Sequence, residues 1–502
     1  MPIHEAVKVW CCQAKPEQVM RRRDFLQKAG RFAVAAPLTA GWYARTPCVA
    51  AETDPKEPVR APTAGPLRVH ADNPRYFTDG SGKAIYLTGS HTWSNLMDMG
   101  SSDPPPRFNF TAYLEFLGRL NHNFIRMWTW ESVSWKPGHW RPGATHTVAP
   151  LPFARTGPGT AMDGKPRFDL TKYDREYFDR LRSRVAAAGK QGFYVSVMLF
   201  EGWAMQFSEN SWKAHPFHPA NNINQIDGDV NQDGKGLEVH TLQSAKVTAL
   251  QEAYVRKVID TVGDLDNVLY EISNENHPPS TAWQYRMIDY VHRYESRKAK
   301  QHPVGMTFQY RGGSNRILFE SPADWISPNH EGGYRDNPPA ADGRKVILSD
   351  TDHLWGIGGN QAWVWKSFLR GLNSLFMDPY DGTVLGKRFD KKWEPVRKSL
   401  GYTLRYAQHM KLAAMRPHGE LASSGYCLAS PAAVGGEYLA YLPAGGKVTV
   451  DLSATSGNLK LQWFSPSTGA SKASGSIEGG ARRTLVGPFA GDTVLWLRGK
   501  RS

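Results

Sequence analysis

The sequence predicts a closed parallel (β/α)8 barrel followed by a small antiparallel β-sandwich. Eight strand-like runs alternate with helical periods across about 300 residues, which suits a closed barrel better than an open sheet. An open doubly wound sheet needs a glycine-rich phosphate turn after its first strand, and Gly89-Ser90-His91-Thr92 lacks the G-x-G-x-x-G pattern. Beyond residue 412, short alternating runs separated by Gly, Ser and Pro predict the sandwich.

The expected elements follow one another without internal repeats. A strand pair around the turn at 79–82 precedes the barrel, whose strands are expected at 84–90, 123–130, 193–200, 267–273, 304–310, 324–328, 345–350 and 374–378. Helical periods between or after them include 111–120, 177–189, 250–262 and 393–412. Sandwich strands are expected at 437–443, 447–453, 459–466 and 492–498. The predicted domains are therefore a barrel at 66–412 and a sandwich at 415–502.

Residues 1–51 resemble a twin-arginine export signal. Arg22 and Arg23 precede an Ala-rich, mildly apolar run, and Val49 and Ala51 have the small-residue spacing of a cleavage site. The alternative is an amphipathic N-terminal helix. Cleavage would leave Glu52 first, ahead of a Pro- and Ala-rich linker at 52–65. We therefore expect a periplasmic or extracellular protein.

Composition excludes several classes of partner. The formal charge is +14, from 61 Lys and Arg against 47 Asp and Glu, but the basic residues are not clustered, so nucleic-acid binding is not expected. A 40% hydrophobic content is ordinary for a globular chain, and no integral membrane association is expected. Aromatic residues make up 12% of the chain, and their flat faces suit sugar rings, so the expected partner is a carbohydrate. The oligomeric state stays open.

Paired carboxylates at strand ends predict glycosidic cleavage. Reacting groups of such barrels lie at the C-terminal ends of the strands, and strands four and seven face one another across the mouth. Hydrolysis needs one carboxylic acid and a second carboxylate, so Glu275 is predicted to act with Asp350 or Asp352. Asp350 directly follows an apolar run and is favoured as nucleophile or base, while Asp352, of equal strand parity, is the substitute. Arg126 can keep a carboxylate ionised, and Asn274 can hold the sugar 2-hydroxyl.

Other strand ends carry candidate substrate contacts, with the tryptophans as candidates for stacking on sugar faces. These residues are His91, Trp93, Trp128, Trp130, Glu201, Trp203, His277, Glu331, His353, Trp355 and Asp378. Structural roles stay open beside the functional ones. Arg126 is equally well explained as a member of an ion pair inside the barrel. One of the two aspartates is equally well explained as a helix cap or as a group that orients a neighbour.

No metal or cofactor is predicted. The loop at 227–234 resembles half of a calcium loop, with Asp229, Asn231 and Asp233 at alternate positions and Gly234 at the turn. The bidentate Glu is missing, because the twelfth position counted from Asp229 is His240, so a solvated loop is favoured. No H-E-x-x-H, G-x-S-x-G or phosphate-loop motif occurs.

Several of these segments carry a family resemblance. Asn274-Glu275 after VLYEIS, with Arg126 in NFIRMW, resembles the (β/α)8 glycoside hydrolases whose acid/base is a Glu preceded by Asn on strand four. RYFTDGSGKAIYLTGSHTW (75–93) resembles the apiosidase-like catalytic-domain family. EYLAYLPAGGKVTVDLS and LQWFSPSTG are similar to the module described as a "putative collagen-binding domain of a collagenase".

The resemblance implies an exported enzyme that hydrolyses O-glycosidic bonds of a polysaccharide or oligosaccharide with two carboxylates, retention being the expected outcome. Glu275 would be the general acid/base. The superfamily has a Glu nucleophile at the end of strand seven, whereas VILSDTDH offers only aspartates. The alternative is a barrel that binds a glycan or matrix protein without cleaving it. We expect no collagen affinity from the sandwich.

Overall fold

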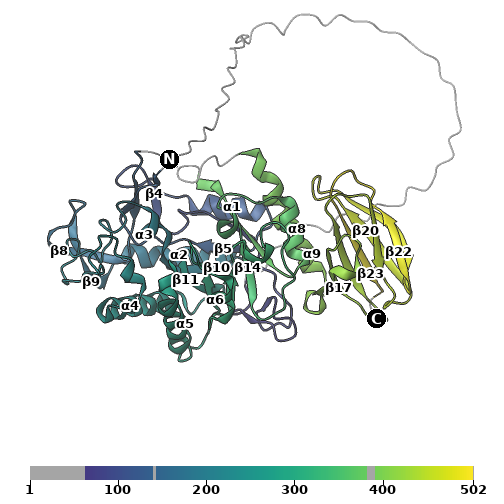
Figure 1. Ribbon diagram of the computed structural model, residues 1–502, viewed down its shortest axis with the longest axis horizontal. Helices are drawn as coiled ribbons and strands as arrows, with labels where there is room; N and C mark the ends of the chain where they lie inside the picture. The colour runs from purple at the N-terminus through teal and green to yellow at the C-terminus, as the bar shows by residue number, and fades with distance from the viewer. Residues whose placement is uncertain (1–62, 139–142, 382–389, 501–502) are drawn as a thin grey trace, which may run out of the picture. The chain divides into compact units, whose positions relative to one another are not determined.

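The protein is described by a computed structural model that covers residues 63–138, 143–381 and 390–500 (Figure 1). The segment at 1–51 expected as an export signal, and residues 52–62 of the expected linker, lie outside the described residues. Eight parallel strands close into a barrel in the order β10-β11-β12-β13-β14-β15-β3-β5. Their bounds are β3 (Gly89–His91), β5 (Phe124–Met127), β10 (Tyr194–Glu201), β11 (Val268–Asn274), β12 (Val304–Thr307), β13 (Trp325–Ser327), β14 (Val346–Asp350) and β15 (Asn373–Met377). The predicted fold class is confirmed.

Every residue of the eight barrel strands is buried. Parallel strands covered on both faces read as nearly continuous apolar runs, which is why these segments stood out in the sequence. The pairing between β10 and β11 is the longest in the barrel and runs from Val195 opposite Val268 to Glu201 opposite Asn274. The chain therefore leaves the barrel directly after Glu201 and Asn274, at the same rim.

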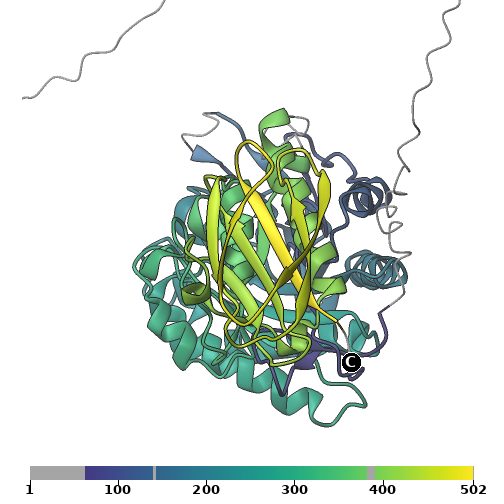
Figure 2. The same ribbon diagram turned by 90° about the vertical axis from the view of Figure 1, so that its right-hand side faces the viewer.

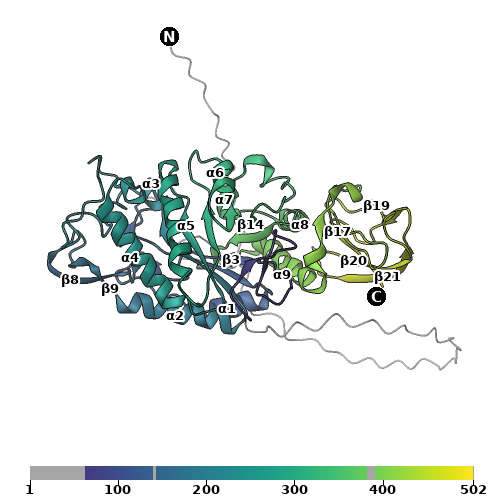
Figure 3. The same ribbon diagram turned by 90° about the horizontal axis from the view of Figure 1, so that it is seen from below.

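Helices surround the barrel (Figure 3). The α-helices are α1 (Phe110–Arg119), α2 (Arg175–Lys190), α3 (Trp203–Phe207), α4 (Ala245–Val262), α5 (Thr281–Glu295), α6 (Asn315–Glu320), α7 (Thr351–Leu354), α8 (Gln361–Leu369) and α9 (Glu394–His409). The 3₁₀ helices are η2 (Leu237–His240), η3 (Pro278–Ser280), η4 (Glu331–Gly333), η5 (Pro379–Asp381), η6 (Lys391–Trp393), η7 (Leu412–Ala414) and η8 (Gly419–Leu421). The connection from β13 to β14 holds only η4, so one crossover has no α-helix. No helix among those described combines the length and apolarity that crossing a bilayer requires.

Short antiparallel sheets decorate the barrel. Before it, β1 (Arg68–Val69) pairs with β2 (Phe77–Thr78) across residues 70–76, whereas an isolated bridge from Phe77 to Ile85 spans the expected turn at 79–82. The sequence did not predict the β1-β2 pairing, nor the sheet β4-β7-β6 and the hairpin β8-β9. Their bounds are β4 (Asp98–Gly100), β6 (Ser134–Trp135), β7 (His146–Ala149), β8 (Phe153–Thr160) and β9 (Pro166–Tyr173).

The C-terminal region is an antiparallel β-sandwich of unequal layers (Figure 2). A six-stranded sheet in the order β16-β17-β18-β23-β20-β21 faces the pair β19-β22, and apolar side chains from both layers form one core. The strands are β16 (Arg416–Pro417), β17 (Cys427–Ser430), β18 (Glu437–Leu442), β19 (Lys447–Asp451), β20 (Asn458–Phe464), β21 (Ser471–Glu478), β22 (Arg482–Val486) and β23 (Thr493–Gly499).

The sandwich shares a further core with barrel helices α8 and α9. Trp365 of α8 stacks on Tyr441 at 6.2 Å, and Tyr406 of α9 meets Trp496 edge-on at 5.2 Å between ring centroids. At the edge of this contact the Gln361 amide donates to the carboxylate of Asp492. The expected junction at 412–415 falls on η7. Burial of several large aromatic rings favours a sandwich that does not move independently of the barrel.

Candidate active site

A cavity of about 460 Å³ opens at the C-terminal ends of the barrel strands. It is lined by Trp93, Trp128, Trp203, Asn274, Glu275, Phe308, Tyr310, His330, Arg335, Asp352, His353, Leu354, Trp355, Gly356 and Met377. Eight of these are predicted site residues, brought together from five different strand ends. A larger cavity of about 860 Å³ lies near the starts of the strands, but Asp79 is its one acidic residue, so it offers no carboxylate pair.

Glu275 occupies the first position after β11, in a strained backbone conformation. Its φ is +43°, in the left-handed region that non-glycine residues rarely adopt, and such strain concentrates at functional sites. The Gln206 amide donates to the Glu275 carbonyl at 2.8 Å. Behind it, a Cβ atom on Gly202 would lie 2.5 Å from Asn276, so the loops after β10 and β11 approach too closely for any side chain there. Local packing therefore holds Glu275 at the rim of the barrel, where it lines the cavity.

The Glu275 carboxyl accepts no hydrogen bond from the described residues and is 8% exposed. Burial raises its pKa well above the usual range, the charge of Asp352 raises it further, and Arg126 opposes both effects. A carboxyl group that stays protonated near neutral pH can donate a proton to a leaving oxygen.

Arg126 on β5 is an almost fully buried cation among several carboxyl groups. Its Nε and Nη2 atoms donate to the two carboxylate oxygens of Glu271 at 2.7 and 2.6 Å. Nη1 donates to Asp352 at 3.0 Å and lies 3.4 Å from Asp350, and Nη2 also donates to Oδ1 of Asn274. One cation thus faces several carboxyl groups, which disfavours full ionisation of all of them.

Asp350 lies beneath the cavity and does not line it. The side chain is fully buried at the end of β14, its Oδ1 accepts the Asp352 N–H at 3.0 Å as the cap of α7, and its Oδ2 lies 2.9 Å from Nε2 of His91. Burial raises its pKa, but His91 and then Arg126 outweigh burial and hold that pKa well below the usual range. Asp350 is therefore ionised, and it holds His91, Arg126 and the start of α7 in place.

Asp352 faces the cavity instead. The chain does not stay extended beyond β14, because α7 begins at Thr351, so equal strand parity does not apply to the two aspartates. Burial raises the pKa of Asp352, Asp350 adds to this, and Arg126 opposes it. The sequence favoured Asp350 because it follows the apolar strand, whereas in the structure Asp352 is the aspartate that lines the cavity.

His353 and Asn274 form an oriented pair at the cavity wall. Burial, and then Arg126, hold the pKa of His353 well below its usual value, so the ring is neutral. Its Nε2 lies 3.2 Å from the Asn274 Oδ1 and its Nδ1 2.7 Å from the Ser327 hydroxyl. Because Oδ1 only accepts, Nε2 carries the proton and the hydroxyl donates to Nδ1. Both donors use Oδ1 of Asn274, which leaves its Nδ2 amide protons for a substrate hydroxyl.

Tryptophan rings build one side of the cavity. Trp93 lies 5.7 Å from Trp128 and 5.9 Å from Trp203 between ring centroids, and Trp355 is 37% exposed. Trp130 does not line the cavity, because its ring stacks on Trp135 at 4.9 Å and its indole N–H donates to the Trp93 carbonyl at 3.0 Å. Trp130 therefore supports Trp93 from behind.

Two further predicted contacts hold loops near the cavity. Glu201 accepts the N–H groups of Trp203 and Ala204 and so caps α3, while burial raises its pKa to about 8. Nε2 of His277 donates to the Leu237 carbonyl at 3.0 Å. Each is engaged with backbone groups, so each positions the loop that follows its strand.

The last two predicted contacts, Glu331 and Asp378, do not line the active-site cavity. Glu331 accepts the N–H of Asn315 at 2.9 Å and borders a different cavity. Asp378 forms a buried ion pair with Arg397, which donates to it at 2.8 Å. Near Glu331, the neighbouring His330 lines the active-site cavity instead.

Sequence reasoning missed several residues. Phe308, Tyr310 and Arg335 line the cavity from loops without a motif. Glu271 had a usable signal, since an acid inside a buried apolar strand requires a cation, and Arg126 lies in a similar run.

Comparisons with known proteins give two family matches and a set of similar solved structures. Residues 143–310 match the family described as "Domain of unknown function (DUF6298)", and residues 424–497 match the "Putative collagen-binding domain of a collagenase". No curated protein matches the chain. A solved structure titled "Glycoside hydrolase" is 14% identical, covering 87% of this chain and 97% of that chain, with a TM-score of 0.56.

Two structures from Bacteroides vulgatus ATCC 8482 are similar as well. A glycoside hydrolase family 5 protein is 13% identical over 87% of this chain and 94% of its own, with a TM-score of 0.56. A protein titled "putative glycoside hydrolase" is 12% identical over 87% and 82%, with a TM-score of 0.58. The chain shares the (β/α)8 barrel fold of these structures. The resemblance of the C-terminal region is confirmed, and the apiosidase-like resemblance stays a prediction.

Proposed function

We propose that the protein is a glycoside hydrolase that cleaves O-glycosidic bonds of a polysaccharide or oligosaccharide, with Glu275 as general acid/base and Asp352 as nucleophile. One observation carries the proposal: two carboxyl groups with raised pKa values line the same aromatic-walled cavity. Asp350 was the first choice from the sequence, and its engagement beneath the cavity favours Asp352.

In the first step, protonated Glu275 donates its proton to the glycosidic oxygen while that bond to the anomeric carbon breaks. The Asp352 carboxylate attacks the anomeric carbon and forms a glycosyl ester. Arg126 orients Asp352 through its 3.0 Å hydrogen bond. The Asn274 amide is placed to hold a sugar hydroxyl, an interaction that strengthens in the transition state.

In the second step, Glu275 acts as the base. After burial, the charge of Asp352 is the largest cause that raises the pKa of Glu275. Ester formation removes that charge, which lowers the pKa of Glu275 when a carboxylate is needed. Glu275 then takes a proton from water, whose oxygen attacks the anomeric carbon and releases Asp352. The anomeric configuration is retained.

The test is turnover by Glu275→Gln across a panel of plant and bacterial glycans. The amide keeps the shape of the side chain but cannot deliver a proton, so we expect a loss of about 10²- to 10⁴-fold with intact sugar binding. Glu320→Gln is the matched control, because that glutamate pairs with Arg316 on the exposed surface of α6. Full activity of Glu275→Gln would overturn the assignment, and binding by the wild type without cleavage of any glycan would favour the non-catalytic barrel.

We also propose two finer points. Residues 75–93 support a place near the apiosidase-like family, so glycans that carry apiosyl groups belong in the panel. The Arg-rich segment before the described residues supports twin-arginine export. N-terminal sequencing of the secreted product tests it, and a retained Met1 or Met20 would refute it.

A further inference from the structure

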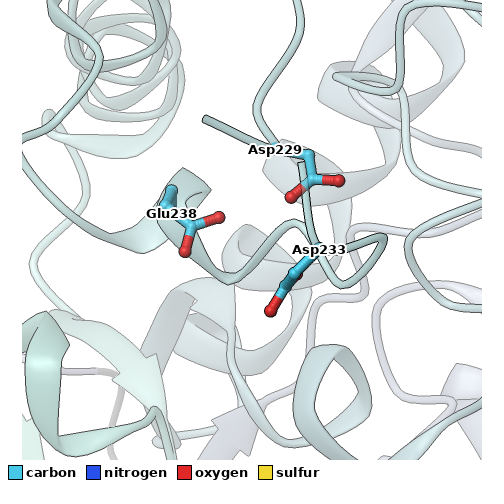
Figure 4. Close-up of side chains that lie close together, drawn as sticks. All are labelled: Asp229, Asp233 and Glu238. Atoms are coloured by element: carbon cyan, nitrogen blue, oxygen red, sulfur yellow. The ribbon is translucent and has the colours of Figure 1, made fainter. Parts of the chain in front are cut away.

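A second group of carboxylates lies in the loop between α3 and η2 and in η2 itself, outside the active-site cavity. Asp229, Asp233 and Glu238 each offer an oxygen, and these oxygens lie within 4.8 Å of one another. Figure 4 shows the three side chains around a common space, with Asp229 and Glu238 directing oxygens toward each other across it.

Two of these carboxylates are buried and incompletely satisfied. Asp229 and Glu238 are each 8% exposed. Asp229 Oδ1 and Glu238 Oε2 are buried atoms with no hydrogen-bond partner among the described residues. Leaving buried carboxylate oxygens unpaired is costly, and like charges at this distance add to the cost. The group therefore lacks a positive partner.

Protein cations do not supply that partner. Lys235 pairs with Asp233 at 3.1 Å, but its side chain is 67% exposed. In the part of the chain that the structure describes, no Lys, Arg or His forms an ion pair with Asp229 or Glu238. A dissolved cation is the remaining source of charge.

The loop has the shape that a cation site requires. Gly234, with φ +79°, makes the turn, and its N–H donates to Asp229 Oδ2 at 2.8 Å. Gly236 has φ +63°, and a Cβ atom there would lie 2.2 Å from the Trp212 ring. The chain then enters η2 directly, which brings Glu238 back to the loop at the tenth position counted from Asp229 rather than the twelfth. Sequence spacing alone predicted no third carboxylate here.

We propose that Asp229, Asp233 and Glu238 bind one Ca²⁺ ion. Carboxylate oxygens are hard ligands, which suits Ca²⁺ and Mg²⁺ rather than Zn²⁺, which prefers nitrogen and sulfur. Mg²⁺ demands near-ideal octahedral geometry and gives up its water reluctantly, so an irregular loop of this kind favours Ca²⁺.

The ion would stabilise the connection between this loop and the catalytic rim. The Leu237 carbonyl accepts the His277 N–H at 3.0 Å, and His277 lies two residues after Glu275. The neighbouring Val239 carbonyl accepts the Gln251 amide of α4 at 2.6 Å. Ca²⁺ at Glu238 would therefore hold η2 against both elements.

Isothermal titration of the chelator-treated full chain with CaCl₂ tests the proposal. We expect one ion per chain with a Kd of about 10⁻⁵ to 10⁻³ M, and weaker binding of MgCl₂. Glu238→Gln should weaken Ca²⁺ binding at least tenfold, and the surface control Glu320→Gln should leave it unchanged. Absence of Ca²⁺ binding by the wild type, undiminished binding by Glu238→Gln, or equal affinity for Mg²⁺ would overturn it.

Calorimetric unfolding provides a second readout. Ca²⁺ should raise the Tm of the wild type, whereas metal-free Glu238→Gln should be at least as stable as the metal-free wild type, because it loses a repelling charge. Should Glu238→Gln fail to fold, Asp233→Asn replaces it, since that side chain is 37% exposed and its loss leaves no cavity. Neither readout uses glycoside turnover, so failure here is distinguishable from failure of the proposed enzyme function.

Discussion

The sharpest test of the proposed site compares two substitutions, Asp352→Asn and Asp350→Asn, because it distinguishes the nucleophile from the positioning residue. Asp352→Asn keeps an oxygen that can accept the hydrogen bond from Arg126 but removes the nucleophile. We expect a fall in kcat of roughly 10⁴-fold or more, as for removal of other catalytic groups. The residue is 9% exposed and its pKa is raised, so the ionised form does not stabilise the fold, and the Tm should not fall by more than about 1 °C.

Asp350→Asn should behave in the opposite way. The new amide places a donor against the donors of His91 or Arg126, and breaking a buried pair costs about 3 to 5 kcal/mol. Unfolding raises the entropy by about 2.1 cal/mol/K per residue, or about 0.9 kcal/mol/K for the roughly 430 residues that the structure describes. The Tm should therefore fall by about 3 to 6 °C. We expect kcat to fall less than in Asp352→Asn, because Asp350 acts by positioning.

The assay combines three measurements on both variants: kcat with an activated aryl glycoside, rescue by azide, and the Tm by calorimetry. Azide should restore turnover of Asp352→Asn alone, as a glycosyl azide of inverted configuration. The reasoning is refuted if Asp350→Asn is inactive and rescued by azide while Asp352→Asn still turns over with an unchanged Tm.

Three further outcomes follow from the same geometry. The profile of kcat/KM against pH should be bell-shaped, with both limbs above the ordinary carboxyl range: activity falls at high pH as Glu275 loses its proton through a raised pKa, and at low pH as Asp352 gains one. Glu275→Gln should lack the alkaline limb, and a limb that persists would assign it to another group. Trp355→Ala should raise KM about 2- to 12-fold at constant kcat, the range expected for losing about 0.5 to 1.5 kcal/mol of ring stacking, and a fall in kcat alone would contradict a substrate-binding role. The full chain should show no retention on immobilised collagen, because one face of the sandwich is packed on α8 and α9, and specific retention would count against this view.

The elements of the fold were predictable where local patterns decide the outcome. All eight barrel strands lie within a few residues of their expected positions, because strands buried on both faces must be continuously apolar. The short strands β4 and β6 to β9 were missed, since pairs of two to eight residues in excursions between barrel elements depend on distant partners rather than on a pattern of their own. The connection between β13 and β14 contains no α-helix, so its sequence has no helical period to detect.

The position of Asn274 and Glu275 at the mouth of the barrel was predictable from the sequence itself. Asn274 and Glu275 follow a strand directly, and in a parallel barrel the end of a strand is already the mouth, so position along the chain implies position in space. Arg126 was identified for the same reason, although its bidentate partner Glu271 was not.

Only the tertiary structure shows that Asp352 lines the cavity and that Asp350 does not. Parity along a strand describes side chains while the backbone stays extended, and here Asp350 caps a helix that begins at the next residue. Glu238 is a similar case, since a compressed turn against Trp212 brings it to the acidic loop two positions early. In both places the direction of a carboxylate depends on where a neighbouring segment packs. The number of residues between two carboxylates in the sequence does not determine that packing.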